Sequence, residues 1–458
     1  MTVSGTVAPI KRYIYVLLAL ATSLLVWSSS SSFVQHHKLS ESDQHCNCQA
    51  PLQDEANIKS KIVPTLGGLP GLLIPFDLEF DKYMERHKRA LLDIGSHSWI
   101  IADLDVGGGL GNRLPGLVNG VLLALLTNRT LLIRYPDYIR RMWDFAVDFD
   151  LENYQIPGEL FSVMEDMNRT LIAVSITEDF ATYFDQARPW MVQGWNYNAP
   201  FLQANPHYRD RIKQLFPDGR VSHHILRRAI RLNNGLSARL AEYTKSKFRP
   251  YTIGIHIRSM KLSNIASMRT YATIALDLAD ASGRPSHEIG FHIAADSESL
   301  RNELALLLGQ ERVTYLPIRL SMLSSIGNPG GSDEEAAMDF VALGSGDAVV
   351  ATYGSSFGQW AGAWSGRNYV TVNQQLTNYS NNKEVAFWKS IKPEPCSFLS
   401  KWFTQSPTAA MSPHVGLVAE RPALERRAVT EEDREAKAVA LLMASPQYLS
   451  HAQCHPQV

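Results

Sequence analysis

The stretch VGGGLGNRLPGLVNGVLLALLTNRTLLIRYP (residues 106–136) places a glycine-rich turn between an apolar run and a long helical pattern. The preceding run, SWIIADLDV (98–106), has the composition of a buried strand. After the turn, apolar residues recur at helical spacing. The run TLLIRY (130–135) then predicts a second strand. A strand, a helix and a strand in this order predict a parallel α/β unit.

The glycine-rich turn matches neither of two common nucleotide-binding signatures. It lacks the G-K-[ST] end of a Walker A loop, and a dinucleotide fingerprint begun at Gly109 would need glycine where Leu114 stands. What remains is a turn too tight for side chains, followed by a helix whose N-terminus favours an anion. Composition alone leaves two interpretations open, a packing turn or a place where a ligand approaches the backbone.

A second α/β unit begins at YTIGIHIRS (251–259). Four further apolar runs follow, with helical stretches between them: 288–296, 312–317, 347–352 and 369–372. Five strands with helical crossovers indicate a nucleotide-binding type of domain. The two units together predict an α/β fold of two Rossmann-type domains that face each other across a cleft. Between the units we expect one basic amphipathic helix, from about Ser222 to Tyr243.

The composition of the two ends sets the predicted domain boundaries. Lys11 and Arg12 precede an uncharged apolar run about as long as a membrane span of roughly 20 residues. We prefer a signal anchor to a cleaved signal peptide because no clean A-x-A site follows, and the preceding positive charges predict a cytoplasmic N-terminus and a lumenal body. The predicted parts are a cytoplasmic tail (1–12), a transmembrane signal anchor (13–33), a stem and linker (34–89), an N-terminal α/β domain (90–245), a C-terminal nucleotide-binding α/β domain (246–400) and a mostly disordered tail (401–458), with one short helical stretch at 430–443.

Charge and cysteine content exclude some classes of function. A formal net charge of −1 argues against a general polyanion binder, so we expect no nucleic-acid partner. The four cysteines could pair in three ways and lack zinc spacing, so no metal site is predicted. Three sequons agree with a lumenal, glycosylated body, at Asn128, Asn168 and Asn378.

The motif GIHIRSM contains the first candidate site residues. Because a strand alternates faces, His256 and Arg258 project to the same side, and at the carboxyl end of a parallel strand that side opens into the cleft. A guanidinium there can grip two phosphate oxygens at once. The alternative is an arginine in an ion pair beside a histidine that lines the core.

The run VVATYGSSFGQWAGAW (349–364) carries a strand into a second possible phosphate site. Ser355 and Ser356 lie where a helix is expected to begin, and hydroxyl and free amide groups there suit an anion. Trp360 and Trp364 are four residues apart on one helix face, which favours core anchors over stacking platforms. Asp296 ends the strand FHIAAD, where its carboxylate could meet a guanine edge or cap the next helix.

Three blocks of the sequence, in order, resemble those of the Golgi fucosyltransferase superfamily: GGLGNRLPGLVNGVLLALLTNRTLLI, IGIHIRS and DAVVATYGSSFGQWAGAW. That group includes plant xyloglucan α-1,2-fucosyltransferases, α-1,6-fucosyltransferases and protein O-fucosyltransferases. The first and third blocks look closest to the plant enzymes, and the resemblance spans about residues 98–375. It implies a GT-B-like fold, GDP-β-L-fucose as donor, a glycan or glycoprotein as acceptor, inversion at the anomeric carbon and no metal or other cofactor. It also implies a single-pass type II protein of the Golgi membrane.

The resemblance further assigns roles to individual residues of this chain. Arg258 would be catalytic and bind the β-phosphate of the leaving GDP, with His256 beside it in the donor site. Asp296 would meet the guanine. The remaining assignments are a diphosphate-lining set, Ser355, Ser356 and Phe357, and a cleft-shaping set, Gly109, Gly111, Asn112 and Arg113.

The sequence departs from the family pattern at one informative position. The α-1,6 enzymes carry paired arginines in the second block, whereas Ser259 follows Arg258 here, which argues against an α-1,6 linkage. No carboxylate base is evident beside this block. Two alternatives remain: a related enzyme that uses another sugar nucleotide, and a catalytically silent protein that binds GDP-sugars or glycans on the same scaffold.

Overall fold

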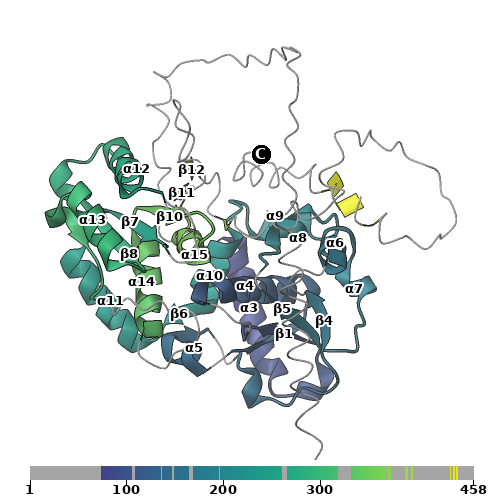
Figure 1. Cartoon of the computed structure of the whole chain (residues 1–458). Coiled ribbons are helices and arrows are strands. Elements are labelled where there is room, and N and C mark those ends of the chain that lie inside the picture. Colours follow the sequence, from purple (N-terminus) through teal and green to yellow (C-terminus); the bar gives the residue numbers. More distant parts are fainter. Residues whose placement is uncertain are drawn as a thin grey trace, which may run out of the picture. The chain divides into compact units, whose positions relative to one another are not determined.

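The computed structural model describes residues 74–105, 109–135, 137–146, 149–164, 169–194, 196–259, 266–317, 332–367, 369–372, 387–389, 394–395, 434, 437–438 and 440–441. All of them belong to one compact unit, Lys59–Val458. They form an α/β fold with two separate sheets of mainly parallel strands (Figure 1). The predicted α/β class with two parallel sheets is therefore confirmed for this part of the chain. The predicted membrane anchor (13–33) and the four cysteines lie outside the described residues.

The first sheet has four parallel strands in the order β2-β1-β5-β4. Their bounds are β1 Trp99–Asp103, β2 Thr130–Arg134, β4 Phe161–Met164 and β5 Trp190–Gln193. The crossover from β1 to β2 is α4 (Leu110–Thr127), as the glycine-rich stretch predicts. By length and composition alone α4 could cross a membrane, but 72% of it is buried inside the fold, so it is a core helix. The other helices of this part are α5 Asp137–Met142, α6 Arg169–Thr177, α7 Phe180–Tyr183, α8 Ala199–Ala204 and α9 Arg209–Leu215.

Helix α3 (Pro75–Ala90) corrects the predicted stem and linker (34–89) over its last part. Pro75 occupies the first turn, where its missing N–H costs no hydrogen bond. Phe76, Phe80 and Tyr83 then recur at helical spacing and are at most 2% exposed, within the main hydrophobic cluster. Their burial makes α3 part of the packed body instead of a linker.

The second sheet has six strands in the order β12-β11-β10-β7-β8-β9. Its strands are β7 Tyr251–Ile257, β8 Ile289–Ala295, β9 Val313–Thr314, β10 Ala348–Thr352, β11 Val370–Val372 and β12 Phe387–Lys389. Only the pairing of β12 with β11 is antiparallel. Its helices are α12 Met268–Ala281, α13 Glu298–Leu308, α14 Ser332–Ser345 and α15 Ser356–Ser365. The five predicted strands are confirmed, with β9 shorter than expected.

The single helix expected over 222–243 is wrong. The structure has α10 (Val221–Ala229), the short strand β6 (Ile230–Leu232) and α11 (Asn234–Lys247). β6 buries its two outer residues, exposes Arg231, and pairs antiparallel with β3 (Trp143–Phe145). Asn233 then caps α11, because its side chain accepts a hydrogen bond from Leu236 N at 2.9 Å. The strand and the new cap interrupt the helical pattern.

One hydrophobic cluster joins the two sheets through their helices. It includes Leu117 and Val121 of α4 together with Phe340 of α14 and Trp360 of α15. Trp360 and Trp364 are 0% and 4% exposed, which confirms them as core anchors. The opposite face of the second sheet is covered by α12 and α13 and has its own cluster (Figure 1).

Two further segments tie distant parts of the chain together. The buried carboxylate of Glu394 accepts hydrogen bonds from Ser222 N (3.1 Å) and Ser222 Oγ (2.8 Å) at the start of α10, and from the Tyr197 hydroxyl. Near the other end, the described residues of 434–441 are helical and lie within the short helical stretch expected at 430–443. Ala438 is fully buried in a cluster with residues of α6 and α8.

Candidate functional site

The candidate site lies where the starts of α4 and α15 meet. A Cβ placed on Gly111 would lie 2.6 Å from Phe357 N and 2.7 Å from Ser356 C, so only glycine allows this approach without a shift. The hydroxyl of Ser356 donates a hydrogen bond of 2.6 Å to Asn112 Oδ1. The first turn of α4 therefore packs against the backbone at the start of α15. We call this contact, formed by Gly109–Arg113 and Ser355–Phe357, the helix-start junction.

Both helices at the junction begin without a capping side chain. Gly109 is the N-cap residue of α4 and Ser355 that of α15, and neither makes a side-chain cap hydrogen bond. Gly354 precedes Ser355 with φ 74°, a conformation that favours glycine and turns the chain sharply from β10 into α15. Amide groups of an uncapped first turn are donors available to an anion.

Arg258 follows the carboxyl end of β7, next to the strand that leads into α15. Its backbone N–H donates to Thr352 Oγ1 at 3.0 Å, and Thr352 Oγ1 donates to His256 O at 3.0 Å. The hydroxyl of Tyr271, on α12, lies 2.7 Å from the same oxygen. Thr352 is fully buried, so this node fixes the backbone at Arg258 against β10. Sequence reasoning missed Thr352 and Tyr271.

The guanidinium of Arg258 is held by Asp296. Nη1 of Arg258 lies 3.5 Å from Asp296 Oδ2, and the arginine side chain remains 30% exposed. Asp296 also accepts from Ser259 N at 2.9 Å and from Ser259 Oγ at 2.8 Å. The cap of α13 is Ser297 instead, because its side chain accepts from Leu300 N. Asp296 is thus not the cap of α13. Arg258 does form the expected alternative, an ion pair, but its side chain stays partly exposed.

His256 lies under the first turn of α15. It is 5% exposed, its ring centroid is 5.3 Å from that of Phe357, and a Cβ on Gly358 would lie 2.7 Å from its Nδ1. Burial, and then the nearby Arg258, lower the pKa of His256 to about 3, so the ring is neutral at physiological pH. Among the described residues Nδ1 has no hydrogen-bond partner. His256 therefore supports α15 without adding positive charge.

Arg113 and Asn128, two other residues singled out in the sequence, lie at opposite ends of α4. Arg113 is 5% exposed and donates through Nη1 to Leu104 O, which ties α4 to the end of β1. Asn128 is exposed at the C-terminal end of α4 with φ 56°, and its Oδ1 accepts from Arg86. The other two predicted glycosylation sites, Asn168 and Asn378, lie outside the described residues.

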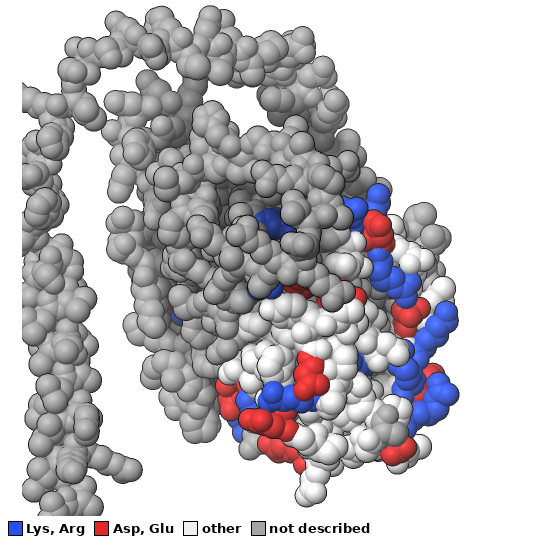
Figure 2. Space-filling model, turned by 90° about the vertical axis from the view of Figure 1, so that its right-hand side faces the viewer, with Lys and Arg blue, Asp and Glu red and all other residues white. Residues whose placement is uncertain are grey.

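Among the described residues on the face seen in Figure 2, basic and acidic side chains are interspersed and form no large surface of one sign. Within the described part of the chain, no group of three or more His, Cys, Asp or Glu residues is placed to hold a metal ion. Metal independence stays a prediction, because it concerns the reaction.

Comparison with solved structures shows the fold. An arginine-to-lysine mutant of Arabidopsis thaliana FUT1 in complex with GDP matches with a TM-score of 0.53 at 15% identity, covering 70% of this chain and 83% of that one. NodZ α-1,6-fucosyltransferase soaked with GDP-fucose matches with a TM-score of 0.44 at 16% identity, over 64% and 99% of the two chains. POFUT1 in complex with GDP-fucose matches with a TM-score of 0.35 at 11% identity, over 58% and 94%.

The likeness to FUT1 shows a GT-B fucosyltransferase-like fold, as the sequence motifs implied. No protein-family model matches the chain, and no curated protein sequence matches it.

Proposed function

We propose that this protein is an inverting glycosyltransferase that transfers L-fucose from GDP-β-L-fucose to a hydroxyl group of a glycan or glycoprotein, without a metal ion. One observation carries the proposal: a partly exposed Arg258 lies at the carboxyl end of β7, where the neighbouring strand leads into the uncapped start of α15. The FUT1 structure that shares the fold holds GDP, which supports a nucleoside diphosphate at this edge of the sheet.

The proposed reaction explains why these groups are needed. The acceptor hydroxyl attacks the anomeric carbon from the face opposite GDP; the new C–O bond forms as the bond to the β-phosphate oxygen breaks, and the hydroxyl proton passes to solvent. Negative charge develops on the departing diphosphate. A fixed guanidinium and the first-turn amides of α15 stabilise that charge. Because His256 is neutral, Arg258 supplies the positive charge on this strand end.

The ion pair with Asp296 suits this role. It holds the guanidinium at 3.5 Å, longer than a direct hydrogen bond, while Asp296 is already engaged by Ser259. An arriving diphosphate can therefore take hydrogen bonds from Arg258 without removing the only partner of a buried carboxylate. Ser259, which stands where the α-1,6 enzymes have a second arginine, thus has a defined structural role here.

The test is a donor screen on the purified protein. GDP-fucose, GDP-mannose and UDP-sugars are incubated with a panel of plant and N-linked glycans, and release of nucleoside diphosphate and the labelled product are measured. We expect transfer from GDP-fucose alone, and undiminished activity with excess EDTA. Complete loss that added metal restores would contradict the metal-independent scheme.

The two alternatives give different results in the same screen. A related enzyme would release nucleotide from another sugar donor. A silent binding protein would bind GDP in a calorimetric titration and release none from any donor and acceptor pair. Either result would overturn fucosyl transfer.

We also propose that residues 13–33 anchor the protein in the Golgi membrane as a single-pass type II protein with a lumenal catalytic region. The charge order of Lys11 and Arg12 before the apolar run supports this topology. The intact chain should stay with membranes after an alkaline carbonate wash, and its lumenal sequons should carry glycans. An uncleaved chain found entirely in the soluble fraction would contradict the anchor.

A further inference from the structure

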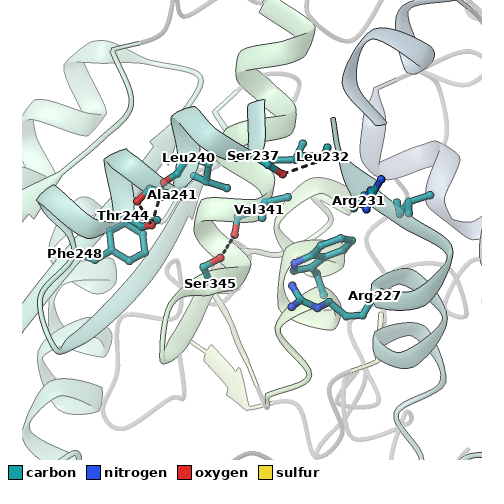
Figure 3. Close-up of a pocket in the computed structure, with 12 residues that line it drawn as sticks. Arg227, Arg231, Leu232, Ser237, Leu240, Ala241, Thr244, Phe248, Val341 and Ser345 are labelled. Atoms are coloured by element: carbon teal, nitrogen blue, oxygen red, sulfur yellow. Dashed lines mark hydrogen bonds between the residues drawn. The ribbon is translucent and has the colours of Figure 1, made fainter. Parts of the chain in front are cut away.

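A pocket lies away from the helix-start junction. Its volume is about 470 Å³, and it opens between the end of α10 with β6 on one side and α11, α14 and α15 on the other (Figure 3). None of the residues predicted for the donor site lines it. α15 reaches both places, with Ser356 at its first turn and Trp364 at its last, and eight residues of helix span about 12 Å. The pocket is therefore distinct from the proposed donor site.

The charge of the pocket comes from Arg227. In Figure 3 its side chain enters from the side opposite Phe248 and Thr244. Its guanidinium lies 5.3 Å from the ring centroid of Trp364, and no described carboxylate lies within ion-pair distance of it. Arg231, the other arginine of the lining, lies 3.5 Å from Asp144. One guanidinium is thus left to meet a ligand's negative charge.

The walls offer hydrogen-bond acceptors and one buried donor. The hydroxyl of Ser237 donates to Leu232 O of β6 at 3.1 Å, and those of Thr244 and Ser345 donate to carbonyl oxygens of their own helices at 3.0 and 2.7 Å. Their lone pairs remain as acceptors for donors in the pocket. The indole N–H of Trp364 is buried without a hydrogen-bond partner among the described residues. Apolar side chains such as Leu240 and Val341 complete the lining.

We propose that this pocket binds a carboxylated sugar, a hexuronate unit, free or at the end of an acidic oligosaccharide. The sugar carboxylate pairs with Arg227, its hydroxyls donate to the three wall hydroxyls, and its apolar face packs on the aliphatic lining. The volume falls in the range of about 300–1,000 Å³ that small-molecule sites occupy. The proposal is independent of the fucosyl transfer argued above.

A carboxylate fits this charge better than a phosphate monoester does. A phosphate monoester carries about −1.5 to −2 charges at neutral pH, whereas a carboxylate carries one. With Arg231 already paired to Asp144, the pocket presents one uncompensated positive charge.

The test is titration of the full protein with D-glucuronate, D-galacturonate, D-glucose and glucose 6-phosphate, followed by calorimetry or saturation-transfer NMR. We expect a uronate to bind at least about tenfold more tightly than glucose, since a charge-assisted hydrogen bond accounts for the difference. Glucose 6-phosphate that binds more tightly than both uronates, or glucose that binds equally well, would overturn the proposal.

Single substitutions test whether the uronate binds in this pocket. Arg227→Gln should weaken uronate binding about tenfold or more, whereas Arg231→Gln should change it less than about threefold. Ala241→Phe, at an exposed lining position, should block the pocket. GDP affinity, measured on the same variants, should be unchanged and shows that the donor site is intact. Uronate binding that survives both Arg227→Gln and Ala241→Phe would place it elsewhere and refute this site.

Discussion

The hydroxyl of Ser356 donates to the side-chain oxygen of Asn112 at 2.6 Å, across 244 residues of chain. This hydrogen bond joins the first turn of α15 to the first turn of α4. Directly beside it, Gly111 contacts the backbone of Ser356 and Phe357. The two glycine- and serine-containing motifs of the sequence therefore form one structural junction.

Gly111→Ala should separate these helix starts. The added Cβ would lie 2.6 Å from Phe357 N, a backbone atom that cannot rotate away. We expect a loss of about 1–3 kcal/mol of unfolding free energy, typical of overpacking, and weaker GDP binding. Thermal unfolding and GDP titration measure the two effects. Gly95→Ala is the matched control, because nothing lies within 4 Å of a Cβ there. Equal melting temperatures for both variants would contradict the tight junction.

Arg258→Lys tests the proposed catalytic arginine. Lysine keeps the charge but loses the two-pronged geometry, so kcat should fall by roughly 10²–10³. The side chain is 30% exposed, so the melting temperature should change little. Arg269→Lys, on the exposed face of α12, serves as the control for a surface arginine. Near-normal turnover in folded Arg258→Lys would remove Arg258 from catalysis.

Thr352→Val tests the node that positions Arg258. Valine keeps the shape but removes the oxygen that receives Arg258 N–H and contacts the Tyr271 hydroxyl, leaving buried polar groups unpaired. We expect a loss of about 1–3 kcal/mol in urea unfolding, and a fall in kcat with little change in the KM for the acceptor. Tyr271→Phe should have a smaller effect. Thr273→Val, at an exposed position on α12, should leave both stability and kcat unchanged. A stability loss without any change in kcat would show that the node is structural alone.

Glu394 predicts a pH dependence of stability. Burial, as the largest cause, raises its pKa from 4.5 to about 7. The folded state then holds a proton that the unfolded state releases, so the contribution of Glu394 is fully present below about pH 4.5 and is lost as the pH rises through about 7. His223 and His256, whose pKa values are lowered by burial to about 4 and about 3, act in the opposite direction.

The Glu394→Gln variant separates these opposing groups. Glutamine resembles the protonated carboxyl, so the variant should lose less stability than the wild type between pH 5 and pH 7.5, while the histidine contribution stays in both. Urea unfolding across this range measures the difference. Parallel pH profiles for the two proteins would show that Glu394 does not titrate in this window.

The sequence predicted the sheets better than the segments between them. The runs around Ile255 and Val350 are long, apolar and bounded by polar turns, so their strands are visible locally. β6 is three residues long and exists because it pairs with β3, about 90 residues away in sequence, a contact that no local pattern reveals. α3 was different. Its N-terminal Pro75 and the regular spacing of Phe76 and Phe80 are visible in the sequence, yet the predicted linker covers them.

The candidate site shows the same division. Arg258 could be proposed from the sequence because the alternation of side chains along one strand and a recognisable motif were enough to select it. Thr352 and Tyr271 were not, since their roles depend on β7, β10 and α12 being brought together. Ser259 was read as a departure from a family pattern, and only its hydrogen bonds to Asp296 show what it does.

The hydrophobic cluster shared by α4, α14 and α15 limits how the two sheets can move relative to each other. Two lobes with separate hydrophobic cores can rotate apart about a flexible linker and expose little apolar surface to water. Here such a swing would expose Phe340 and Trp360, which are fully buried. The motions that leave this cluster buried are small displacements of α15 along α4. In the proposed enzyme, a conformational change during turnover should therefore take the form of shear between these two helices.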